Sequence, residues 1–166
     1  MAVHITALLY RCLSTRQVLK SQLRARRVGM AWSVLTPTIG ENPAMPTAGP
    51  AIIDFATATA AEEVSGVSAD RLISGSPVQA VRNLFADPTG QFFVGIWSST
   101  PGLWRIRYTE SEFCHLLEGV VRLTDSQGTS WSFSAGASFI VPAGFTGTWE
   151  VMEPARKLYA LFEPRR

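Results

Sequence analysis

The chain has 166 residues, of which 46% are hydrophobic, 10% aromatic and 17% charged, and its formal net charge is +2. This length suits one domain with a sizeable buried core, and the composition argues against a disordered chain. No stretch approaches the roughly 18 consecutive apolar residues that a membrane-spanning helix needs. The two cysteines, Cys12 and Cys114, lie in very different settings, which argues against a disulfide framework or a zinc site. They indicate an intracellular protein with reduced thiols.

Charge is distributed unevenly along the chain. Six of the 15 Lys and Arg residues, and none of the 13 Asp and Glu residues, fall within residues 1–40. The remainder is therefore acidic, which argues against a general nucleic-acid-binding surface. Four prolines and two glycines within residues 36–50 are typical of a linker. We therefore expect residues 1–50 to be an irregular, disordered leader and linker, and residues 51–166 to form the folded domain.

The leader has three interpretations. A secretory signal fits poorly, because the basic cluster follows the apolar stretch instead of preceding it. A targeting presequence fits the basic, acid-poor composition. An over-extended start fits as well, since Met30 and Met45 both lie upstream of the domain. We favour the over-extended start and expect a cytoplasmic protein.

In chain order, the domain begins with a short strand expected at residues 51–55, followed by helical or irregular structure and a turn at residues 87–90. From Gln91 onward, short apolar strands alternate with turns rich in Gly, Pro and Asp. This pattern predicts an all-β antiparallel sandwich or barrel. The expected strands are residues 92–99, 103–109, 112–124, 130–134, 138–142, 146–151 and 156–163.

Two glycine-anchored motifs occur within this region. Gly136, Pro142 and Gly144 form a G-x5-P-x-G pattern, and Glu112 precedes Gly119 with six residues between them. Together these resemble the two motifs of the cupin superfamily. The segments GIWSSTPG, YTESEFCHLLEG, VPAGFTGTWEV and KLYALFE resemble the cupins related to ureidoglycine aminohydrolase and to ethanolamine-utilisation proteins. The resemblance implies a double-stranded β-helix, that is, a jelly-roll barrel.

The resemblance also implies where a metal would bind. Metal-binding cupins supply an H-x-H pair, a glutamate and a third histidine, which together hold a divalent transition ion. Glu112 matches the glutamate, but the third histidine falls on Gly147. The H-x-H pair would fall among Arg105, Ile106, Arg107 and Tyr108, none of which is histidine. We therefore predict no metal and no cofactor.

Strand alternation predicts which side chains enter the barrel. If Glu112 points inward, then Cys114 and Leu116 do so too, and His115 points outward. A β-bulge beside Glu112 would reverse this assignment for His115. A desolvated interior carboxylate is a candidate acid or base. It could instead be a structural group bound to Arg105, Arg107 or a tyrosine hydroxyl.

Trp149 and Lys157 occupy positions where the related cupins pair a W-E-V strand with a lysine of the closing strand. The resemblance therefore implies an interior lysine near Glu112, which would form a paired polar centre or receive an anionic ligand. We predict Glu112 as the catalytic candidate. The predicted ligand contacts are Tyr108, Trp149, Lys157, Tyr159 and Arg105.

Three functions are compatible with this sequence. The first is a metal-independent cupin that binds a small molecule in its barrel. The second is an enzyme of the aminohydrolase, isomerase or lyase type that uses Glu112 as acid or base. The third is a structural barrel without a ligand. We favour the first, with a homodimer as the expected assembly, because small barrels often cover their edge strands by pairing.

Overall fold

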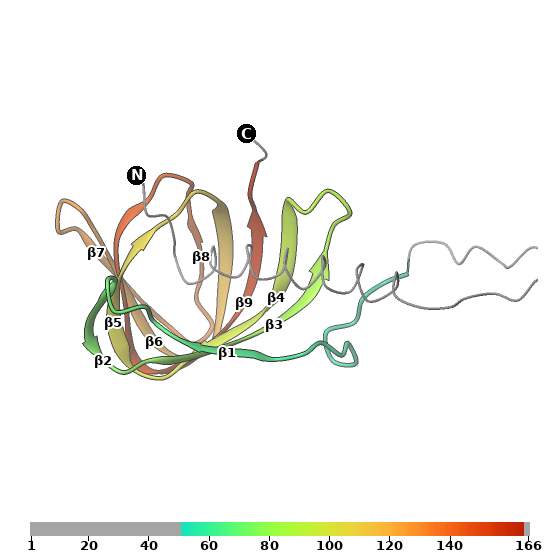
Figure 1. Cartoon of the computed structure of the whole chain (residues 1–166), viewed down its shortest axis with the longest axis horizontal. Coiled ribbons are helices and arrows are strands. Elements are labelled where there is room, and N and C mark those ends of the chain that lie inside the picture. Colours follow the sequence, from blue (N-terminus) through green and yellow to red (C-terminus); the bar gives the residue numbers. More distant parts are fainter. Residues whose placement is uncertain (1–50, 165–166) are drawn as a thin grey trace, which may run out of the picture. The chain divides into compact units, whose positions relative to one another are not determined.

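The computed structural model describes residues 51–164, which form nine strands and no helix. Within these residues there is accordingly no helix that could cross a membrane. The expectations for residues 1–50 fall outside the described part of the chain. The strands are β1 Glu63–Gly66, β2 Leu72–Gly75, β3 Val78–Ala86, β4 Phe92–Ser99, β5 Gly102–Arg107, β6 Ser111–Asp125, β7 Ser130–Ser134, β8 Ser138–Val141 and β9 Thr146–Phe162 (Figure 1).

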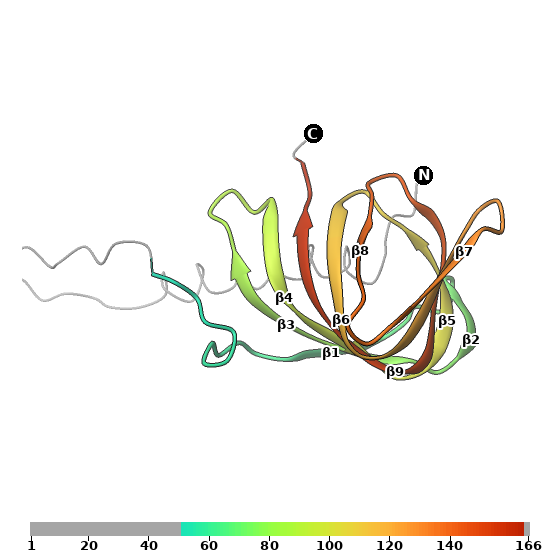
Figure 2. The same cartoon turned by 180° about the vertical axis from the view of Figure 1, so that it is seen from behind.

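Every strand pairing is antiparallel, and two long strands connect the halves of a curled sheet. β6 and β9 contain 15 and 17 residues and pair with each other along most of their length. The first part of β9 pairs with β5, whereas its last part pairs with β4. β6 likewise pairs with β8 near its start and with β7 near its end. The two strands thus curve from one half of the sheet to the other (Figures 1 and 2).

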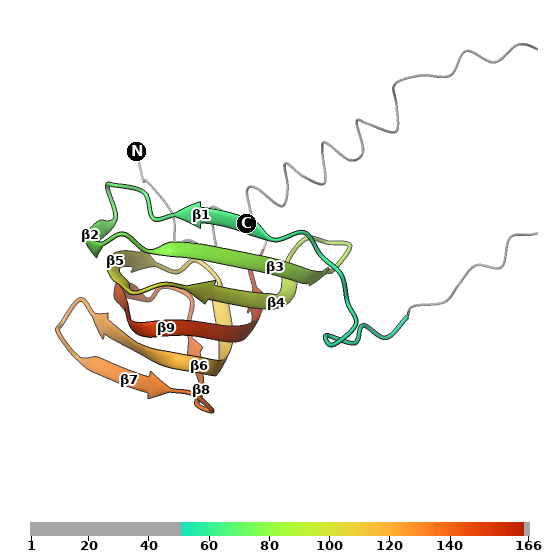
Figure 3. The ribbon, with the colours of Figure 1, turned by 90° about the horizontal axis from the view of Figure 1, so that it is seen from below.

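Each half of the sheet has its own set of shorter strands. β1, β3 and β4 continue outward from the last part of β9, side by side in the order shown in Figure 3. β5 and β2 continue from the first part of β9. The turn spacing predicted an antiparallel sandwich or barrel, and this curled arrangement is the jelly-roll barrel that the family resemblance implied.

The bend of β6 is located at Gly119. The register between β6 and β9 shifts three times between Leu116 and Val121. Gly119 has a φ of +83°, a conformation that residues with a Cβ rarely adopt. A Cβ added there would lie 2.7 Å from the Cα of Ala155 and 2.8 Å from the carbonyl carbon of Pro154. Glycine therefore allows the two long strands to approach closely where they turn.

Several expected elements differ from the structure. The expected strands at 146–151 and 156–163 are one strand, β9. Three strands, at 63–66, 72–75 and 78–86, were not anticipated, and the first of them lies where helical or irregular structure was expected. The expected strand at 51–55 is wrong, since residues 51–54 have no regular structure and the first strand begins at Glu63. Ile52 is 96% exposed, so this apolar run has no sheet face against which to pack.

The core lies between the two halves of the sheet and is rich in aromatic side chains. Along β4, β6 and β9, buried and more exposed residues alternate, as expected for strands with one face inward. The large core residues include Phe93, Trp97, Trp104, Ile106, Leu116, Val121, Leu123, Trp149, Val151, Tyr159 and Leu161. Three charged residues are buried among them, namely Glu110, Glu112 and Lys157.

Candidate functional site

A fully buried ion pair occupies the centre of the barrel. The ammonium of Lys157 donates hydrogen bonds to both carboxylate oxygens of Glu112, at 2.9 and 3.0 Å. The two side chains are 1% and 0% exposed. Lys157 lies on β9, where its register partner on β6 is Leu116, while Glu112 lies at the start of β6. The pair therefore links two neighbouring strands diagonally on their inward face.

Tyr108 completes the hydrogen bonding of the carboxylate. Its hydroxyl donates to Oε2 of Glu112 at 2.8 Å, and its backbone is fixed by two hydrogen bonds to the corner after β8. One runs from its N–H to the carbonyl of Phe145, and the other runs from the N–H of Gly144 to its carbonyl. Burial and the negative charge of Glu112 raise the pKa of Tyr108 well above its ordinary value, so the phenol stays protonated and donates.

The ammonium of Lys157 has three further neighbours. It lies 3.2 Å from Sγ of Cys114, 4.4 Å from the ring centroid of Trp149 and 5.2 Å from that of Trp97. The indole faces attract the cation through their quadrupoles. Burial favours the neutral amine, but the negative charge of Glu112 and its hydrogen bonds to the ammonium outweigh burial and raise the pKa of Lys157. Burial raises the pKa of the Cys114 thiol, so a neutral thiol faces a charged ammonium.

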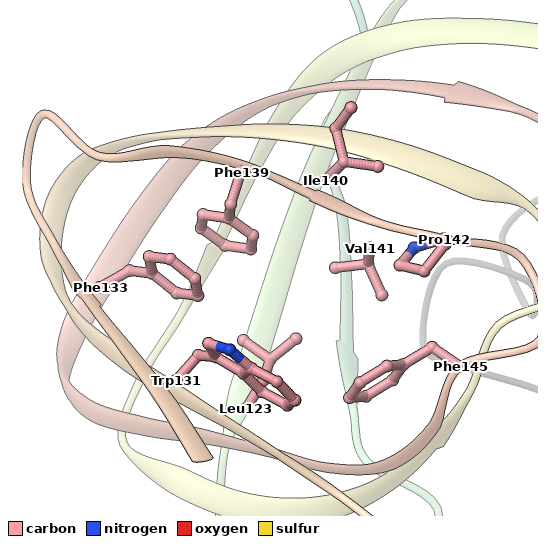
Figure 4. A pocket seen from close by; sticks show the side chains of 8 residues that line it. All are labelled: Leu123, Trp131, Phe133, Phe139, Ile140, Val141, Pro142 and Phe145. Carbon is pink, nitrogen blue, oxygen red and sulfur yellow. The ribbon is translucent and has the colours of Figure 1, made fainter. Parts of the chain in front are cut away.

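A separate, mostly apolar cavity opens between β6, β7 and β8. Its volume is about 230 Å³. The phenyl rings of Phe133 and Phe139 are stacked, with centroids 3.9 Å apart and an interplanar angle of 9°. Trp131 and Phe145 form a second, edge-to-face pair with centroids 6.4 Å apart. The lining residues, seen in Figure 4, are Leu123, Trp131, Phe133, Phe139, Ile140, Val141, Pro142 and Phe145.

The cavity and the ion pair are connected through Trp149. The ring of Phe139, which lines the cavity, lies 6.3 Å from the ring of Trp149, and Trp149 in turn covers the Lys157 ammonium. Val141, another lining residue, is the register partner of Glu112. The two features are therefore neighbours, although the ion pair itself is closed to solvent.

Comparisons with known proteins agree with this architecture. Residues 86–159 match the model of the EutQ-like cupin domain. The chain belongs to the cupin superfamily. Among proteins with curated functions, none matches the sequence.

Several solved structures resemble this cupin. A protein of unknown function of the DUF861 family from Pseudomonas syringae pv. tomato has 28% identity and a TM-score of 0.57, over 63% of this chain and 45% of its own. The EutQ protein of Clostridium difficile has 18% identity and a TM-score of 0.47, over 52% and 63%. A putative ethanolamine utilization protein from Salmonella typhimurium has 15% identity and a TM-score of 0.49, over 64% and 99%. This chain thus spans less than half of the Pseudomonas protein.

The residues at the usual metal position of a cupin do not fit a metal ion here. Both oxygens of Glu112 are engaged by Lys157, and Tyr108 is bonded to the same carboxylate. Arg105 and Arg107 are exposed on the outer face of β5. Nowhere in residues 51–164 do three His, Cys, Asp or Glu side chains gather as a metal site would require. Lys157 thus supplies the positive charge beside the inward carboxylate.

The structure brings together four of the six predicted site residues, namely Glu112, Lys157, Tyr108 and Trp149. Tyr159 is buried beside them but donates its hydrogen bond to Oδ1 of Asn83. Arg105 does not join the others, because it alternates with the buried Trp104 and Ile106 and points outward. Neither Arg105 nor Arg107 is the partner of Glu112. The functional roles assigned to these residues stay predictions.

The inward and outward assignments along β6 follow simple alternation. Cys114 and Leu116 are 0% exposed, and half-buried His115 contacts the Ser138 hydroxyl through Nδ1 at 2.9 Å. The aromatic cavity was not anticipated. The sequence did contain one signal for the cavity. In β7, Trp131 and Phe133 alternate with serines, so the two aromatic side chains share one face of the strand. Its other walls come from β8 and the following corner, which local sequence does not place beside β7.

Proposed function

We propose that this cupin binds a small, flat, mostly apolar molecule in the aromatic cavity and does so without a metal. The observation that carries the proposal is the pair of aromatic walls, Phe133 with Phe139 and Trp131 with Phe145. Flat rings bind well between such walls because stacked and edge-to-face contacts are both favourable. Drug-sized pockets have volumes of roughly 300–1,000 Å³. A cavity of about 230 Å³ therefore suits a molecule of one ring.

In this proposal the ion pair supports the cavity and does not touch the ligand. Glu112 and Lys157 are sealed from solvent, and the Lys157 ammonium is held against Trp149, which contacts the cavity wall at Phe139. A cation fixed over an indole face restrains the indole ring. The pair therefore keeps the inner wall in place. An anionic ligand at Lys157 would have to displace Glu112 from a buried pair, which is strongly unfavourable.

An enzyme of the aminohydrolase, isomerase or lyase type would need Glu112 to reach a substrate proton. A general base must lie within about 2.6–3.2 Å of the proton's heavy atom, directly or through one water. Here Oε1 accepts from Lys157, and Oε2 accepts from Lys157 and Tyr108, inside a closed interior. This arrangement favours binding over catalysis by Glu112.

Phenol provides a direct test, since it is flat, has one ring and is small enough for the cavity. We expect the full chain to bind phenol saturably with a Kd on the order of 1 mM, a realistic affinity for seven non-hydrogen atoms. Tryptophan fluorescence and thermal shift would report the binding. Trp131→Ala should weaken it roughly 10-fold, because half of one wall is removed. Dialysis against EDTA should leave binding unchanged.

Phe92→Ala is the matched control, because Phe92 is an aromatic residue of similar exposure to Trp131 but does not line the cavity. It should bind phenol as the parent does. Absence of saturable phenol binding by the parent would favour a structural barrel without a ligand. Loss of binding on EDTA treatment would contradict the metal-independent mode.

A further inference from the structure

A second buried polar feature lies in the core of the barrel and is distinct from the ion pair. Within residues 51–164, four buried side-chain polar atoms have no hydrogen-bond partner: Nε2 and Oε1 of Gln79, Nε1 of Trp97 and Nε1 of Trp149. Gln79 is 0% exposed, and both tryptophans are 2% exposed. Buried polar groups almost always form hydrogen bonds, so a fully buried amide with both ends unpaired requires an explanation.

The strand register places these groups close together. Gln79 on β3 is opposite Ser99 on β4, and Trp97 is two residues from Ser99 on the same inward face. Such diagonal neighbours have Cα atoms about 7–8 Å apart, within reach of long and aromatic side chains. Trp97 in turn contacts Trp149, with ring centroids 5.7 Å apart. One continuous region of the core therefore contains all three residues.

The neighbouring protein groups do not supply hydrogen-bond partners for these four atoms. The hydroxyl of Ser99, the register partner of Gln79, already donates to the carbonyl of Thr100 at 2.8 Å. The nearby charges of Lys157 and Glu112 neutralise each other. The unpaired groups thus offer the two N–H donors and one carbonyl acceptor of an amide together with two indole N–H donors.

We propose that this region is a second, internal site that binds a small neutral amide. An amide ligand can form two parallel hydrogen bonds with Gln79, donating to Oε1 and accepting from Nε2. The second lone pair of its carbonyl oxygen remains for an indole N–H of Trp97 or Trp149. A carboxylate matches less well, because it has no donor for Oε1 and brings an uncompensated charge into the core. The site is independent of the aromatic cavity proposed above.

Binding can be followed through the indole N–H signals of the ¹⁵N-labelled full chain, which contains five tryptophans. Acetamide should move the signals of Trp97 and Trp149 saturably, whereas acetate at the same concentration should not. The signal of Trp131, in the aromatic cavity, should stay in place with acetamide and move with phenol. Because acetamide and phenol are expected to move different tryptophan signals, the experiment tests the internal site and the aromatic cavity separately, and one proposal can be contradicted while the other holds.

Gln79→Leu is the decisive variant, because it removes donor and acceptor while nearly preserving volume. It should weaken acetamide binding by roughly 10-fold or more, since the paired hydrogen bonds are lost. Ser99→Ala is the matched control, because its hydroxyl is already bonded to Thr100, and it should bind acetamide like the parent. If Gln79→Leu does not fold, the proposal is tested on the parent alone, by comparing the shifts that acetamide and acetate cause in the indole N–H signals of Trp97 and Trp149. Equal responses to acetamide and acetate, or no response to either, would overturn the proposal.

Discussion

At the scale of single residues, Glu112 and Lys157 have the most demanding environment in the domain. Both are almost completely buried and bonded to each other. Glu112→Gln removes the negative charge at nearly constant volume and leaves an ammonium buried without its carboxylate. We expect a loss of about 3–5 kcal/mol in the free energy of unfolding, measured by urea denaturation.

Glu118→Gln is the matched control for this variant. Glu118 also pairs with a basic residue of β9, Arg156, but the two side chains are 60% and 47% exposed. Exposed ion pairs contribute about 0–1 kcal/mol, so the control should unfold close to the parent. Similar small losses in both variants would mean that the Glu112 carboxylate is not buried with Lys157.

The same buried centre predicts an alkaline limit to stability. Burial raises the pKa values of Cys114 and Tyr108 in the folded domain, and that of Lys157 is raised by its neighbours against the effect of burial. A group whose pKa is raised by folding stabilises the protein fully below its unfolded pKa, and this contribution is lost as the pH rises toward the folded pKa. The first group affected is the thiol, whose ordinary pKa is 9.0.

We therefore expect the free energy of unfolding to fall above pH 9, by up to about 1.4 kcal/mol per pH unit for each group. Urea denaturation between pH 7 and pH 11 measures this. Cys114→Ala should delay the fall toward pH 10, where Tyr108 and Lys157 begin to titrate in the unfolded chain. Stability that does not change up to pH 11 would contradict the closed environment described for all three groups.

At the scale of elements, the bend shared by β6 and β9 depends on Gly119. Gly119→Ala combines a left-handed backbone with a Cβ that would meet the backbone of Pro154 and Ala155. Gly128 has a similar φ, +87°, but a Cβ there would meet nothing within 4 Å. We expect Gly128→Ala to cost about 1–2 kcal/mol from backbone strain alone, and Gly119→Ala to cost at least about 2 kcal/mol more. Equal melting temperatures for the two variants would mean that the strands can separate at the bend without penalty.

At the scale of the whole molecule, the outer face of the sheet carries a row of apolar side chains, some of them exposed. Val94, Ala160, Phe113 and Ile140 form one register row across β4, β9, β6 and β8, and Phe113 and Ile140 are 45% and 67% exposed. The charged residues on the same two strands, Arg156 of β9 and Glu118 of β6, form an ion pair with each other. Their charges cancel, so this pair does not favour a strongly charged partner. We therefore propose that a second copy of the chain covers this face.

Analytical ultracentrifugation tests the assembly. The parent should sediment as a species of about twice 18.1 kDa at micromolar concentration. Phe113→Lys should shift it toward the monomer, because the charge would be desolvated at the contact. A parent that is already monomeric, or a Phe113→Lys variant that remains dimeric, would remove this face as the interface.

The sequence by itself determined the fold class and the faces of its strands. The Gly and Pro spacing after Gly136 and the alternation from Glu112 to Leu116 are local features, and local features decide where a chain turns and which side chain points inward. The inward position of Lys157 followed from the same alternation together with the family resemblance. Short apolar runs remain ambiguous at this level, as residues 51–55 show, because a strand also needs a neighbouring strand.

Only the tertiary structure decided which inward groups meet. The family resemblance implied a lysine near Glu112, but the bond itself joins residues 45 positions apart and depends on the register of β6 against β9. The aromatic cavity needs walls from β6, β7, β8 and the corner at Phe145. In the sequence, nothing distinguishes Gln79 from other strand residues. Its burial with an unpaired amide becomes evident only once β3 and β4 are paired in the folded sheet. Contacts between distant segments depend on how the sheet curls, and no periodicity within a single strand encodes that curl.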